Sequence, residues 1–236
     1  MTTAEPGSSP AAPYQPQCAP GFAPLLERFD RRALDDNPGT VFGLWSDFRL
    51  AYANAEWFRF AAANGGEPAI STASTVGSVI MNAIPADLQP YYRYLYALAN
   101  TRDRRRSVPL CHEYDCSSPE TYRRFAMQIY TLDGYQGYLV VNSLLIERPH
   151  DPGAAVLAPR EEDYLDANGL FCQCSHCRRY RRNSAPALWD WVPAWVERQP
   201  RGTSHGLCQI CFDYYYPKGT TERQRDLPPG TIAPEA

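Results

Sequence analysis

Two Cys-x-x-Cys pairs near the end of the chain constrain its folding more than any other feature. They are Cys174-Ser-His-Cys177 and Cys208-Gln-Ile-Cys211. Two residues between thiolates let both sulfurs face one point, and two such pairs supply the four sulfurs of a closed tetrahedral zinc site. The segment 178–207 exceeds the usual spacing of about 15–20 residues between pairs, and a helix over 189–198 can occupy the excess. The sequence therefore predicts one structural zinc ion held by Cys174, Cys177, Cys208 and Cys211.

The residues around the two cysteine pairs indicate which other cofactors or redox functions the pairs could serve. Covalent c-type haem needs a histidine directly after the second cysteine, where this chain has Arg178 and Phe212. That motif is excluded. A thioredoxin-like dithiol needs one pair beside a βαβ pattern, and here two pairs occur without it. An iron–sulfur cluster also uses four thiolates, so cluster and redox sites remain alternatives to zinc.

Three residues near the pairs have open roles. Cys172 is either a small buried strand residue or a spare thiol that replaces an oxidised ligand. His176 is a turn residue or a further ligand. His205 suits hydrogen bonding to a metal-bound thiolate, because four cysteines already complete a tetrahedron.

A second polar cluster, CHEYDC at 111–116, contains His112 and Cys116. Such a group can bind metal, but strand alternation places His112 and Glu113 on opposite faces. The pattern favours the polar edge of a strand over a metal site.

The stretch 39–147 alternates between strand and helix patterns. Period-2 apolar alternation predicts strands, and 3–4 spacing predicts helices. Asn54 is placed to cap a helix that Gly65-Gly66 end. The order of two strands, helices and three strands predicts an α+β domain with a five-stranded antiparallel sheet. The expected strands are 39–45, 48–54, 107–114, 122–132 and 138–147, and the second expected helix is 85–101.

The core of this predicted domain lies outside the cysteine pairs, so we expect it to fold without the metal. Its expected members are Phe42, Leu44, Trp57, Phe60, Phe125, Met127, Ile129, Val140 and Leu144.

The regions before and after this predicted domain form further segments of the chain. Residues 1–37 combine a disordered Pro-, Ala- and Ser-rich start, through residue 20, with a short amphipathic helix over 20–36. That helix packs on its own domain or forms a dimer. After the domain at 38–147 we expect a Pro- and Gly-rich linker at 148–165, a cysteine-rich module at 166–218 and a disordered tail at 219–236.

Two stretches resemble known families. VFGLWSDFRLAYANAEWFRFA and FAMQIYTLDGYQGYLVVNSLL, within 39–147, resemble a PAS domain. Residues 170–217 are similar to the cysteine-rich tail after some bacterial PAS and receiver domains, which ends in Ser-His-Gly-x-Cys-x-x-Cys. The resemblance implies a PAS-like sheet with helices on one face and a pocket between them that senses a ligand, redox state or partner. The Asn-Cys-Arg-Phe motif of light-sensing flavin domains is missing, which argues against a photoactive flavin cysteine. The sequence does not identify the ligand.

The charge of the chain and the motifs that it contains limit the functions that the sequence allows. A net charge of −3 gives no global attraction for nucleic acid, although Arg178, Arg179, Arg181 and Arg182 form a local basic run. The start of the sequence has no secretory signal pattern, and its longest apolar run is too short to span a bilayer. The cysteines then indicate a reducing cytoplasm rather than disulfides.

No catalytic motif was found in the sequence. We therefore expect a cytoplasmic signalling protein that is not an enzyme, does not bind membranes, and docks a partner protein through its zinc module. A homodimer through the PAS part or the N-terminal helix is a further expectation. The alternative is a nucleic-acid-binding regulator that uses the arginine run.

Overall fold

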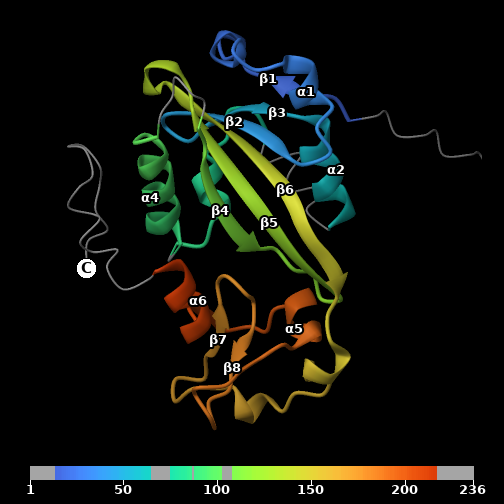
Figure 1. Ribbon diagram of the computed structural model, residues 1–236. Coiled ribbons are helices and arrows are strands. Elements are labelled where there is room, and N and C mark those ends of the chain that lie inside the picture. The colour runs from blue at the N-terminus through green and yellow to red at the C-terminus, as the bar shows by residue number, and fades with distance from the viewer. Residues whose placement is uncertain (1–13, 65–74, 87, 103–107, 217–236) are drawn as a thin grey trace, which may run out of the picture.

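A six-stranded antiparallel sheet forms the larger part of the molecule (Figure 1). The computed structural model describes residues 14–64, 75–86, 88–102 and 108–216. The strand order is β1-β3-β2-β6-β5-β4. Their bounds are Gln17–Cys18 (β1), Val41–Trp45 (β2), Leu50–Ala53 (β3), Leu110–Asp115 (β4), Thr121–Thr131 (β5) and Gly137–Pro149 (β6). The predicted α+β class is confirmed, and β2 to β6 are the five expected strands with shifted ends.

Strand β1 is the difference from the predicted sheet. Residues 1–20 were expected to be disordered, but Gln17 and Cys18 pair with Ala53 and Tyr52 of β3. The N–H of Ala19 also donates to the carbonyl of Ala51, at 2.6 Å. The edge of β3 offers unpaired backbone groups, and a short polar segment satisfies them. The prediction was wrong for residues 14–20, and residues 1–13 lie outside the described part.

The helix expected over 20–36 is split in two. A 3-10 helix, η1, covers Ala23–Leu26, and α1 covers Arg31–Asp35. Asp30 separates them because its extended backbone and side chain cap a new helix. Its Oδ1 accepts from the N–H groups of Arg32 and Ala33, at 3.0 and 3.2 Å.

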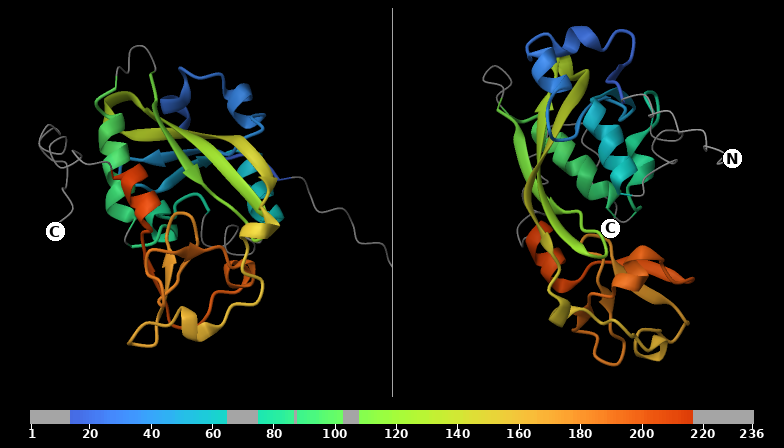
Figure 2. Two further views of the ribbon diagram at one scale, coloured as in Figure 1. Left: turned by 60° about the horizontal axis from the view of Figure 1, so that its bottom comes forward. Right: turned by 90° about the vertical axis from the view of Figure 1, so that its right-hand side faces the viewer.

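This N-terminal segment packs on its own sheet, on the face opposite the main helices (Figure 2). Phe22 and Leu26 are buried there beside Val41 and Leu139. A Cβ on Gly43 would lie 2.3 Å from the ring of Phe22, so only glycine lets this ring reach the sheet. The expectation of helices on one face alone is therefore corrected: both faces of the sheet are partly covered.

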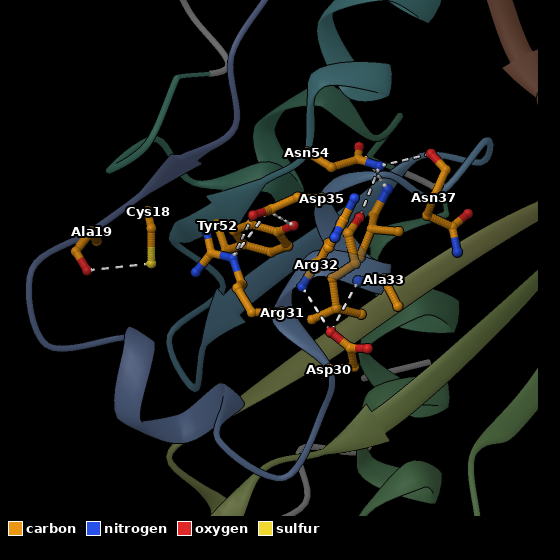
Figure 3. Close-up of polar contacts among 12 residues, drawn as sticks. Cys18, Ala19, Asp30, Arg31, Arg32, Ala33, Asp35, Asn37, Tyr52 and Asn54 are labelled. Atoms are coloured by element: carbon orange, nitrogen blue, oxygen red, sulfur yellow. Dashed lines mark hydrogen bonds and ion pairs between the residues drawn. The ribbon is translucent and has the colours of Figure 1, made fainter.

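A polar cluster fastens the segment to the sheet (Figure 3). The hydroxyl of buried Tyr52, on β3, donates to Oδ1 of Asp35, at 2.7 Å. Arg31 donates to the same carboxylate, at 2.9 Å, and its guanidinium lies 4.4 Å from the centre of the Tyr52 ring. Burial, followed by the hydrogen bond to Asp35, raises the pKa of Tyr52 well above its ordinary value. The phenol therefore remains a neutral donor to this carboxylate.

We predict that Asp35→Ala lowers the free energy of unfolding by about 1–3 kcal/mol, because a buried hydroxyl loses its acceptor. The matched control is Asp36→Ala. Asp36 and its ion-pair partner Arg32 are both exposed, and such pairs contribute about 0–1 kcal/mol. Denaturant unfolding measures both variants, and equal losses would contradict the role given to Asp35.

Two α-helices cover the other face of the sheet, α2 (Ala55–Ala63) and α4 (Gln89–Ala99). Asn54 begins α2 as predicted: its Oδ1 accepts from the N–H of Trp57, at 3.1 Å, and also from the N–H of Val41, at 3.0 Å. The cap thus joins the helix to the neighbouring strand. The end predicted at Gly65-Gly66 and the strand start at Ser107 lie outside the described residues.

The core between sheet and helices matches the predicted set with one exception. Eight of the nine residues are buried or packed against the core, whereas the side chain of Leu144 is 48% exposed. The β5–β6 register shifts between Arg124 and Phe125, and β6 then runs on toward its exposed end at Pro149. Strand alternation alone does not reveal where a long strand leaves its covering helices.

The cysteine module, which we define as residues 150–216, lies beyond the end of β6 (Figure 1). A second sheet has the order β10-β7-β8-β9. Its elements are β7 (Phe171–Cys174), β8 (Tyr180–Arg181), β9 (Trp189–Asp190), α5 (Pro193–Glu197), β10 (Thr203–Gly206) and α6 (Gln209–Tyr215). The helix expected over 189–198 is reduced to α5, which Pro193 begins. The part of the chain before residue 150 is called the sheet half below.

The expected linker at 148–165 is mostly exposed, but it contains short ordered elements and contacts the module. β6 extends to Pro149, and short 3-10 turns follow at Pro152–Ala154 and Glu161–Asp163. Val156 donates its N–H to the carbonyl of Trp191, at 2.9 Å. Tyr164 is buried in the small core of the module with Phe171, Tyr180 and Val192.

Candidate metal centre

A parallel pairing of two strands brings the cysteine pairs together. Cys174 is the last residue of β7 and lies opposite Gly206, the last residue of β10. Cys208 follows two residues later and its N–H points at Cys174 Sγ, 3.4 Å away. Residues far apart in the sequence therefore meet because β10 adds alongside β7.

A tight turn shapes the first pair. The N–H of Arg178 donates to the carbonyl of Cys174, at 2.9 Å, and the N–H of Cys174 donates to the carbonyl of Arg179, at 2.8 Å. Arg178 closes the turn with a φ of 62°, a left-handed conformation that is costly for a residue other than glycine. This turn directs Cys177 back toward Cys174.

The second pair opens helix α6. Cys208 is the N-cap residue, and its sulfur accepts from the N–H of Cys211, at 3.4 Å. Cys211 lies in the first turn of the helix, so both sulfurs point to the same side. Backbone N–H groups aimed at sulfur favour the thiolate form, which is the form that binds metal.

The four sulfur atoms form one group. They lie within 4.8 Å of one another, and the Sγ atoms of Cys177 and Cys208 are 3.8 Å apart. Tetrahedral zinc with bonds of about 2.3 Å requires sulfurs about 3.8 Å apart. The distance between Cys177 and Cys208 matches the separation of roughly 4 Å that a shared zinc ion requires. The group as a whole is somewhat wider. Its size and donors fit a single metal ion.

Because the four cysteines are buried or half-buried, the group needs a bound cation when its thiols are ionised. Cys174, Cys208 and Cys211 are buried, with 0, 2 and 7% of their surface exposed, and Cys177 is half-buried. Hydrogen bonds from Cys177, Cys208 and Cys211 lower the pKa of Cys174 far below its ordinary value, and the same coupling raises the pKa of Cys177 and Cys211, so without a metal ion the thiols share their protons. Several buried thiolates side by side repel strongly, and a bound divalent ion removes that cost.

No protein-family model matches this chain, and no curated protein matches it.

Within the described residues, no helix has the length and apolar character needed to cross a membrane. All eight cysteines are free thiols.

The other candidate ligands lie outside the group of four sulfurs. Cys172 is half-buried in β7, as its strand interpretation predicted. His205 is exposed, and its Nε2 lies 3.1 Å from Nε2 of Gln199, so its contact is with an amide side chain. His176 is buried between the two cysteines of the first pair.

His112 and Glu113 take opposite faces of β4, as predicted: His112 is half-buried and Glu113 is exposed. The Nδ1 of His112 lies 3.3 Å from the hydroxyl of Tyr91. Burial, with a smaller effect of His176, lowers the pKa of His112 to about 4. His112 is thus a neutral, half-buried histidine, and Cys116 is an exposed residue directly after the end of the same strand.

An aromatic junction joins the metal site to the sheet half. The His176 ring stacks on Tyr215 of α6, with centroids 3.8 Å apart and planes 14° apart. Tyr91 of α4 packs against Tyr216, at 4.8 Å, and the His112 ring lies 5.4 Å from Tyr215. The buried cluster of the sheet half therefore includes Cys174, Cys208 and Cys211.

Polar contacts at the β4–β5 loop complete this junction. Arg178 donates to the carbonyl of Ser117, at 3.2 Å, and to that of Val196, at 2.9 Å. The indole N–H of Trp191 donates to the carbonyl of Pro119, at 3.2 Å. Sequence reasoning missed both these polar contacts and the aromatic junction. For the aromatic junction, the tyrosine-rich runs at 91–96 and 214–216 were the available signal, because several aromatic residues on short helices need a surface to cover them.

The arginine run is not one free basic surface. Arg178 is engaged at the junction, and Arg182 pairs with Asp190, at 2.8 Å. Arg181 is half-buried and Arg179 is exposed. Two of the four arginines, Arg178 and Arg182, therefore make contacts within the chain.

Proposed function

We propose that this protein is a signalling protein without a catalytic activity of its own. In this proposal the sheet half is a PAS-like sensor, and the cysteine module binds structural zinc and docks a partner protein. The observation that supports docking most directly is the surface of α6. Ile210, Phe212 and Tyr214 have 74, 48 and 55% of their surfaces exposed.

The metal site supplies the fixed position that such a surface needs. Helix α6 has only seven residues, and an isolated helix of that length is unstable in water. Cys208 caps it, Cys211 anchors its first turn, and Tyr215 is buried at its far end. The apolar side chains between these anchors are held facing solvent. Exposed apolar groups on a rigid element are typical of sites where proteins bind.

The sensor assignment is supported by the order of elements. Two strands, β2 and β3, are followed by helices and then by three strands, β4 to β6. These strands belong to one antiparallel sheet, and α2 and α4 cover a shared face of it. This is the arrangement that the PAS resemblance implies. The junction places the module against α4 and β4, so a change in the sheet half has a direct route to α6. A cytoplasmic location and a homodimer through the PAS-like part or the N-terminal helix remain parts of the proposal.

We predict that the double variant Ile210→Asp, Phe212→Asp abolishes partner binding while zinc content and folding stay unchanged. Buried apolar anchors contribute about 2 kcal/mol or more each to an interface, and both residues lie outside the sulfur group. Cross-linking and mass spectrometry in the native cell identify the partner, and titration with that partner measures affinity. The control is Leu157→Asp, another leucine-sized exposed side chain, with 77% of its surface exposed. Undiminished binding by the double variant would rule out docking through α6.

Nucleic-acid binding is the alternative, carried by the exposed Arg179 and the half-buried Arg181. Phosphate contacts make affinity fall steeply as salt rises. Tight, salt-sensitive binding of DNA or RNA that is lost in Arg179→Ala would replace the docking proposal with the regulator. Absence of such binding at physiological salt would remove the alternative.

A further inference from the structure

A cleft of about 660 Å³ lies between the sheet half and the cysteine module. Its walls come from the end of α2, the β4–β5 loop and the module. This volume is within the range of small-molecule sites, about 300–1,000 Å³, and such sites occur preferentially between domains. Inside the sheet half, the rings of Tyr96 and Tyr138 contact each other, with centroids 4.9 Å apart.

The cleft carries charges of both signs. Arg178, Glu120 and Glu197 line it, and among the described residues none of these three forms an ion pair. Arg178 has five N–H donors, and its two hydrogen bonds go to neutral carbonyl oxygens. Its charge and remaining donors are thus available to a carboxylate. Arg123, also in the wall, is already paired with Glu147, at 2.6 Å.

Apolar side chains also line the cleft. They are Phe60 and Ala63 of α2 and Val196 of α5. A ligand that satisfies all three features has a carboxylate for Arg178, an ammonium group for the glutamates and an apolar body. We propose that the cleft binds a free α-amino acid with an apolar side chain. This inference rests on the sensor part of the proposed function and names its ligand class.

The same geometry links binding to the junction. Arg178 already connects Ser117 of the sheet half to Val196 of the module. A carboxylate bound to its free donors adds a contact on the same guanidinium. Binding therefore tightens the contact between the two parts and slows amide exchange in the β4–β5 loop and α5.

The test uses the full-length, metal-loaded chain and calorimetric titration with L-leucine. L-leucinamide lacks the carboxylate and N-acetyl-L-leucine lacks the ammonium group. We expect saturable binding of L-leucine and affinities about tenfold or more lower for both derivatives, because each loses a charge-assisted hydrogen bond. Arg178→Gln should weaken L-leucine binding to the same extent, whereas Arg179→Gln, the exposed neighbour, should not.

A second variant separates ligand binding from the stability of the junction. Ala63→Trp fills the cleft from α2 and leaves the contacts of Arg178 in place, so it should abolish binding with unchanged zinc content. No saturable binding of L-leucine at millimolar concentration, equal affinity for the two derivatives, or full affinity in both Arg178→Gln and Ala63→Trp would overturn the inference. Failure of docking alone is distinguishable, because Ile210→Asp, Phe212→Asp should lose the partner and still bind L-leucine.

Discussion

The variant Cys208→Ser should lose its metal and unfold the cysteine module. Cys208 supplies one sulfur of the group and also caps α6, through the N–H of Cys211. Structural zinc contributes about 10–16 kcal/mol in small zinc domains, which is comparable with the total stability of about 5–15 kcal/mol of a typical domain. The small core around Tyr164, Phe171 and Tyr180 is insufficient without it. Elemental analysis and limited proteolysis measure the two effects.

The matched control is Cys172→Ser. Cys172 lies two residues from Cys174 on the same strand, is half-buried, and is outside the sulfur group. We expect this variant to keep its metal and its resistance to protease. A Cys208→Ser protein with full metal content and an intact module would show that the four sulfurs do not act as one site.

Removal of the metal by a chelator should have a different effect on each part of the chain. The module should lose its structure, whereas the sheet half should keep a cooperative melting transition, because its strands and helices contain none of the four cysteines. That transition should shift downward by about 2–8 °C. Loss of the contacts that Tyr91 and His112 make with Tyr215 and Tyr216 costs about 1–2 kcal/mol, and such a loss lowers the melting temperature of a domain of this size by several degrees.

Calorimetry with and without EDTA measures this shift, and Cys208→Ser provides the metal-free comparison without chelator. Complete loss of the transition would mean that the two parts fold as one unit. An unchanged transition would mean that the aromatic junction contributes nothing to the stability of the sheet half.

Local patterns in the sequence predicted much of this structure. The spacing of Cys174, Cys177, Cys208 and Cys211 predicted their convergence, because two residues between thiols set the geometry of each pair independently of the rest of the fold. Period-2 alternation located β5, where Phe125, Met127 and Ile129 are buried. Asn54 marked the start of α2, because capping depends on a few neighbouring residues.

Features that depend on tertiary contacts were not predictable in this way. β1 exists because the edge of β3 accepts Gln17 and Cys18, and nothing in the composition of residues 14–20 encodes that partner. The exposure of Leu144 depends on where the covering helices end. The roles of His176 and Arg178 at the junction depend on the docking of two parts of the chain, and no single-sequence pattern contains that information.

Metal analysis of freshly purified, reduced protein tests the central claim most directly. Elemental analysis combined with X-ray absorption at the metal edge gives both the identity of the ion and its ligands. The proposal predicts one zinc ion per chain, bound by four sulfurs at about 2.3 Å. Iron in place of zinc, a nitrogen or oxygen ligand in place of a sulfur, or the absence of metal from folded protein would contradict it.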